Sequence, residues 1–112
     1  MITEKNIIVP IYRYALKIVI FDDFKEVKEV IPDIDSNDSK GLLLDYGDRS
    51  IICVPPHDTL TIVHECEHAK NAIWKRIGFI PTPENDEPDA YLIEYLYKEV
   101  MKIVKKHLAT QC

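Results

Sequence analysis

Residues 59–77 read TLTIVHECEHAKNAIWKRI and have the periodicity of an amphipathic α-helix. Asp58 or the threonine after it is a suitable N-cap, and Gly78 is a suitable stop, because glycine readily adopts the backbone conformation that ends helices. An apolar stripe at helical spacing consists of Ile62, Cys66, Ala69, Ile73 and Ile77. Since such a stripe packs on the core, His64 and His68 are predicted to face away from it.

The regions before and after this helix have their own patterns. We expect a strand over residues 12–21, a short helix over 22–30 capped by Asp22, a loop over 33–40, a hairpin over 41–54 and a second long helix from 85 or 86 to 108. The second long helix has an apolar stripe of Leu92, Leu96, Val100 and Ile103. The order predicts an α+β fold for residues 1–112, a single domain whose small antiparallel or mixed sheet packs against both long helices.

Composition excludes several classes of protein. Hydrophobic residues make up 46% and charged residues 29%, as in ordinary globular proteins. The formal net charge of -5 argues against nucleic-acid binding, which needs clustered lysine and arginine. No apolar segment approaches the roughly 20 residues that cross a bilayer, so no membrane association is expected. Three cysteines at positions 53, 66 and 112 suit reduced thiols, and together with the lack of a secretory signal they indicate a cytoplasmic protein.

The sequence His64-Glu65-Cys66-Glu67-His68 has the spacing of a zinc site. On a helix, the two histidines differ by about 40° in direction and about 6 Å along the axis, so both imidazoles can reach one ion. Zinc accepts such nitrogen ligands in a tetrahedral array. Glu65 lies beside them and could act as a general base without occupying a ligand position. Cys66 belongs to the apolar stripe, and we interpret it as a core residue rather than a ligand.

This motif resembles that of the gluzincin metallopeptidases, in which a glutamate on a following helix completes the zinc site, commonly within a Glu-x-x-small pattern. Residues 87–90, EPDA, reproduce the pattern after a gap of 18 residues from His68. The resemblance implies that Glu87 is the third zinc ligand. Asp89 and Glu94 are the alternatives, although Glu94 lies about 10 Å further along the helix and Asp89 points in another direction. For the whole chain, the likeness is to small zinc peptidase-like proteins of phages and prophages.

The chain departs from the gluzincin pattern at Tyr91, where an aspartate or asparagine often supports a zinc-bound histidine. The Tyr91 hydroxyl could replace that support or donate a hydrogen bond to the substrate oxyanion. Packing of Tyr91 in the helix interface is the alternative. His57 is a weaker oxyanion candidate.

Other metal chemistries fit less well. A metzincin would carry glycine at 71 and histidine at 74, where this chain has asparagine and tryptophan, and a di-iron bundle needs two Glu-x-x-His pairs.

The motif is compatible with two functions. The first is a zinc-dependent metallopeptidase that hydrolyses a peptide or protein substrate, aligned by edge pairing with residues 50–54. The second is a catalytically silent phage or prophage binding or assembly protein that keeps the metal. Oligomeric state and cleavage preference stay open.

Overall fold

The computed structural model describes residues 1–34 and 39–111. In chain order its elements are β1 (Ile2–Val9), β2 (Tyr14–Phe21), the 3-10 helix η1 (Phe24–Glu29), β3 (Leu42–Asp45), β4 (Arg49–Val54), α1 (Thr59–Ile77) and α2 (Glu87–Ala109). The fold is α+β, as predicted: a four-stranded mixed sheet with two long helices. In the part of the chain that the structure describes, no helix has both the length and the apolar character that a membrane crossing requires.

The strand order in the sheet is β1-β2-β4-β3. β2 and β4 run parallel, with Ile18 opposite Ile52, and the pairs β1–β2 and β3–β4 are antiparallel. β2 and β4 are therefore the inner strands, whereas β1 and β3 each have one edge without a partner strand in the sheet.

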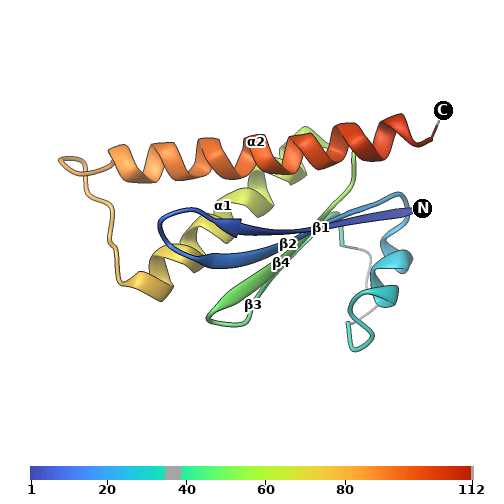
Figure 1. Cartoon of the computed structure of the whole chain (residues 1–112), viewed down its shortest axis with the longest axis horizontal. Coiled ribbons are helices and arrows are strands. Elements are labelled where there is room, and N and C mark those ends of the chain that lie inside the picture. Colours follow the sequence, from blue (N-terminus) through green and yellow to red (C-terminus); the bar gives the residue numbers. More distant parts are fainter. Residues whose placement is uncertain (35–38, 112) are drawn as a thin grey trace.

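Both faces of the inner strands are buried. Ile18, Ile20 and Ile52 pack with the apolar stripes of α1 and α2, and Figure 1 shows both long helices on one side of the sheet. On the other face, Val19 and Cys53 pack with residues of η1 and the segment after it. This double coverage explains why residues 18–21 of β2 and residues 51–54 of β4 are continuously apolar rather than alternating.

The predicted ends of α1 are confirmed. The Asp58 side chain accepts a hydrogen bond from the Thr61 backbone at 3.1 Å, and Gly78 ends the helix with a φ of 77°. Ile62, Cys66, Ala69 and Ile73 are buried as the stripe predicts. The prediction for Ile77 is wrong, because its side chain is 46% exposed. After Gly78 the chain folds back, and Phe79 packs on Trp74 with 4.6 Å between ring centroids.

The N-terminal half departs from the predictions in three places. β1 was not anticipated, because its polar residues 3–6 interrupt the strand pattern at an exposed sheet edge. β2 starts at Tyr14 instead of residue 12, because the preceding turn contains positive φ angles at Ile11 and Arg13. The short helix is a 3-10 helix capped by Asp23 rather than Asp22. Within the predicted loop, residues 35–38 lie outside the described residues.

Asp22 instead joins the sheet to the end of α2. One of its carboxylate oxygens lies 2.8 Å from Nε2 of the buried His107, and the Gln111 amide donates to the same carboxylate at 2.7 Å. His107 Nδ1 in turn lies 2.7 Å from the Thr3 hydroxyl. The hydrogen bond with His107, followed by that from Gln111, lowers the pKa of Asp22 to about 2.

Asp22→Asn is expected to reduce the free energy of unfolding at pH 7. Because the folded-state pKa of Asp22 is depressed, its stabilisation is present above about pH 4 and is lost as the pH falls through about 2. The Asp22 side chain is 38% exposed, so solvent screening limits the loss to about 1 kcal/mol. Urea denaturation at pH 7 and pH 2 tests this, with Asp48→Asn as an exposed control. An equal loss for Asp22→Asn at both pH values would contradict it.

Candidate metal centre

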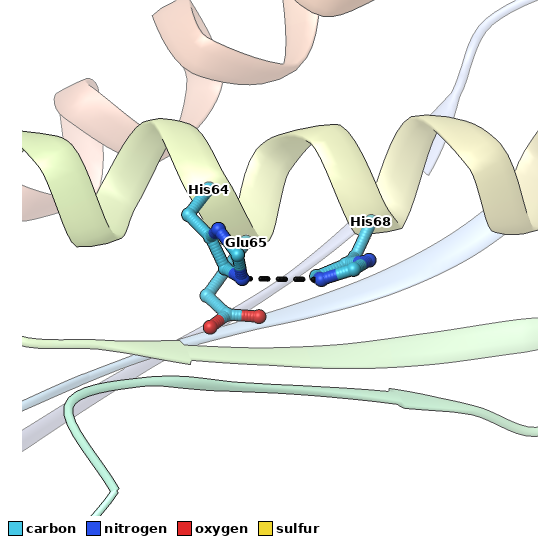
Figure 2. A group of neighbouring side chains, drawn as sticks. All are labelled: His64, Glu65 and His68. Carbon is cyan, nitrogen blue, oxygen red and sulfur yellow. Dashed lines mark hydrogen bonds between the residues drawn. The ribbon is translucent and has the colours of Figure 1, made fainter.

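His64 and His68 lie one turn apart on α1, as their spacing predicts. Their Nε2 atoms are 3.2 Å apart, and the ring planes are inclined by 83°. The ligand atoms of these histidines and of Glu65 all lie within 4.8 Å of one another. Figure 2 shows the three side chains pointing from α1 toward the strands, on the side of α1 opposite α2.

The separation of the two Nε2 atoms fits two ligands of one metal ion. Zinc–imidazole bonds of about 2.0–2.1 Å in a tetrahedral arrangement place the two nitrogens about 3.3 Å apart. The observed 3.2 Å agrees with this value, and without a metal it is also the length of a hydrogen bond between one imidazole N–H and the other ring nitrogen. Imidazole nitrogens also suit copper, iron and nickel. The cluster could therefore hold a metal ion, and the geometry alone leaves the identity of that metal open.

Glu65 differs from the histidines in its environment. Both histidines are exposed, whereas Glu65 is only 7% exposed. Burial raises the pKa of the Glu65 carboxyl above its ordinary value, against the opposing effect of the neighbouring histidines. A carboxylate with a raised pKa is a better proton acceptor near neutral pH, because its basicity approaches that required for proton transfer from water.

Cys66 does not contribute to this cluster. Its side chain is fully buried in the core, and burial raises the pKa of the thiol to about 12. Metal binding requires the thiolate, which is strongly disfavoured there. The prediction that Cys66 is a core residue is confirmed.

The cluster lines a groove between α1 and the edge strand β3, which we call the metal groove. Its volume is about 490 Å³, and its lining residues are Gly41, Leu42, Leu43, Asp45, His64, Glu65, His68, Asn71, Ala72 and Lys75. Sequence reasoning missed the contribution of Asn71 and Lys75. Helical periodicity could have found both, because they continue the histidine face at the seventh and eleventh positions after His64.

Gly41 permits the close approach of the segment before β3 to α1. A Cβ atom at position 41 would lie 2.6 Å from Thr61 Cγ2 and 3.1 Å from Glu65 Cγ. The β-branched Thr61 is itself buried and has little freedom to move. Gly41 therefore helps to set the position of the Glu65 side chain.

Gly41→Ala is expected to destabilise the protein by about 1–3 kcal/mol, the usual cost of inserting a methyl group into a packed contact. Chemical denaturation measures this loss. Gly41→Ala combined with Thr61→Ser, which removes the atom nearest to the new methyl group, should recover part of it. If Gly41→Ala alone is as stable as the wild type, the contact between position 41 and Thr61 relaxes without a loss of stability.

The structure does not bring the predicted third ligand to the histidines. Among the described residues, the cluster consists of His64, Glu65 and His68, and Glu87 is exposed at the start of α2. Glu94 is also exposed on α2. Tyr91 is 66% exposed, so it neither lines the metal groove nor packs in the helix interface.

Contacts of Asp89 with α1 hold the start of α2 in place. Its carboxylate accepts a hydrogen bond from Trp74 Nε1 at 2.7 Å and pairs with Lys70 Nζ at 2.9 Å. Lys70 is almost fully buried and pairs with Glu67 as well. These contacts lie on a different face of α1 from the histidines. Glu87, two residues before Asp89, is exposed and is not part of the histidine cluster.

Comparisons of the chain with known protein families, with curated proteins and with solved structures give no match. The geometry of the cluster and its groove is therefore the basis for inferring the function.

Proposed function

We propose that this protein is a zinc-dependent peptidase. The 3.2 Å separation of the two Nε2 atoms is the observation that carries the proposal, because it matches two ligands of a tetrahedral ion. The neighbouring Glu65 supports a catalytic role, since a purely structural zinc site has no use for a general base and usually fills all four positions with protein ligands. When bound, zinc would supply Lewis-acid polarisation of the scissile carbonyl and acidify the attacking water.

The chain's own residues would have the following roles. His64 and His68 bind the ion through Nε2. Glu65 accepts a proton from the attacking water and then transfers it to the leaving amine. Burial of Glu65 near Gly41 limits its movement, so the carboxylate would stay close to an ion held by the two histidines rather than free in solvent.

The substrate would lie along β3 rather than along residues 50–54. Those residues belong to β4, an inner strand whose hydrogen-bonding groups are used by β2 and β3, so the earlier edge-pairing expectation is wrong. β3 is an edge strand and borders the metal groove. An extended peptide paired with β3 would pass in front of the histidines.

Glu87 stays a prediction as the third ligand. Its recruitment would require the first turn of α2 to approach the histidine face of α1. Glu65 is the alternative, because its carboxylate oxygen already lies within ligand range of the cluster. A binding protein that retains the metal without cleavage is the second candidate function, favoured because no residue of α2 joins the cluster among the described residues.

Metal analysis and a peptide-library cleavage assay test the proposal together. Protein purified without added metal should contain about one zinc ion per chain, and the zinc-loaded protein should cleave library peptides. Zinc without cleavage, in protein that keeps its fold, would favour the binding function. Absence of zinc affinity would refute both functions.

A further inference from the structure

A second groove lies beside the N-terminal end of α1. It has a volume of about 960 Å³ and runs between residues 21–24, at the end of β2, and residues 55–60, which enter α1. We call it the Phe24 groove. A hollow of about 380 Å³ shares Lys40 and Leu60 with the Phe24 groove and shares His64 and Glu65 with the metal groove. These shared lining residues place the three hollows next to one another along α1.

The Phe24 groove combines an aromatic wall with excess negative charge. Phe21 and Phe24 meet edge to face, with 5.5 Å between their centroids, and Pro55 and Pro56 also line the groove. Its charged lining consists of Asp22, Asp23, Asp58 and Lys40, and it also contains His57. Because the Met1 ammonium pairs with Asp22 at 3.3 Å, Asp23 and Asp58 are the carboxylates that remain to be set against Lys40. This remaining negative charge favours a cation, and the partly exposed Phe24 favours an apolar stem.

Local hydrogen bonds hold these aspartates in place. Asp58 accepts from the Thr61 backbone and hydroxyl, Asp23 accepts from the Lys25 backbone, and Asp22 is held by His107 and Gln111. The hydrogen bonds with Thr61 also lower the pKa of Asp58, so this group stays ionised at neutral pH. Asp23 and Asp58 can each accept further hydrogen bonds, because two carboxylate oxygens offer about four acceptor positions. The Asp22 carboxylate is already occupied, because it contacts His107, both of its oxygens accept from Gln111, and it pairs with the Met1 ammonium at 3.3 Å.

We propose that the Phe24 groove is a specificity subsite that binds a lysine or arginine side chain of the peptide substrate, an inference that rests on the proposed peptidase function. From Leu60 to Glu65 the helix rises about 7.5 Å, whereas an extended peptide rises about 3.3 Å per residue. The basic residue would therefore lie two or three positions from the cleaved bond. Its stem contacts Phe24, and its cation faces Asp23 and Asp58.

Peptide binding without cleavage tests this subsite directly. The probes are two sets of eight-residue peptides that differ only in having lysine or norleucine two or three positions from the central bond. Norleucine keeps the apolar stem and removes the charge. Fluorescence anisotropy with Glu65→Gln protein whose zinc content has been verified should show about fivefold tighter binding of the best lysine peptide at low salt. If this variant does not hold zinc, metal-free wild-type protein is used in its place. The ratio should approach one in 1 M NaCl, because salt screens charge pairs.

Asp23→Ser combined with Asp58→Ser isolates the role of the two carboxylates. Serine is also a favoured N-cap, so both helix caps can persist while two charges are lost. The lysine-to-norleucine ratio should fall to about one. Asp48→Ser combined with Glu84→Ser removes two charges from exposed positions elsewhere and should retain the fivefold ratio.

The outcomes separate this inference from the proposed function. Failure of both peptide sets to bind, equal binding of the two sets, or a lysine preference that survives the Asp23 and Asp58 substitutions would overturn the subsite. Cleavage is measured separately with the wild-type chain. Cleavage without lysine preference would support the peptidase and refute the subsite, whereas lysine-dependent binding without cleavage would do the reverse.

Discussion

Replacement of Glu65 by glutamine is expected to lower kcat/KM for peptide cleavage by about 10²- to 10⁴-fold, the usual contribution of a positioned general base. Glutamine has nearly the same shape, so it should fit under Gly41, but its amide cannot accept the proton of the attacking water. The variant should keep its zinc. Steady-state cleavage of the best library peptide and zinc analysis of the same preparation measure both effects.

Glu67→Gln is the matched control. Glu67 is in the same motif on the same helix, but its side chain is 49% exposed and pairs with Lys70 rather than facing the cluster. Its replacement should leave kcat/KM within about twofold, since surface substitutions away from a site have small effects. If Glu65→Gln cleaves normally, Glu65 is not the base. If it loses zinc as a histidine variant would, Glu65 is a ligand.

The sequence predicts α1 well because its signals are local. Asp58 and Gly78 define its ends, and the stripe from Ile62 to Ile73 determines which face is buried. β1 and the parallel pairing of β2 with β4 are harder to predict, because which strands pair with one another depends on the whole chain. The apolar segment in β4 is compatible with an edge or an inner strand, and only the pairing with β2 decides between them.

The histidine cluster was predictable for the same reason, since one helix holds all of its residues. The placement of Glu87 could not be predicted from the sequence, because it depends on how α2 packs against α1. A partial signal was available in Lys70, which lies one turn after Cys66 on the core side of α1. A buried lysine requires carboxylate partners, and Asp89 at the start of α2 provides one. That pairing places Asp89, and with it the start of α2, away from the histidine face.

Zinc is expected to raise the melting temperature of the wild-type chain and to have no such effect on His68→Ala. A ligand that binds only the folded state at a hundred times its Kd stabilises by about 2.7 kcal/mol, which corresponds to roughly 10 °C for a domain of this size. His68 is exposed, so without metal its removal should change the melting temperature little. Differential scanning fluorimetry with and without zinc measures both quantities.

His57→Ala is the control for this experiment, because His57 is an exposed histidine outside the cluster. It should retain the full zinc-dependent shift, and loss of the shift there would indicate that zinc binds elsewhere.

Glu87→Gln then identifies the third ligand. A shift as small as that of His68→Ala would mean that the first turn of α2 approaches the histidines when zinc binds. A full shift would leave Glu65 as the remaining carboxylate in reach, and the zinc content of Glu65→Gln would then distinguish a ligand from a general base.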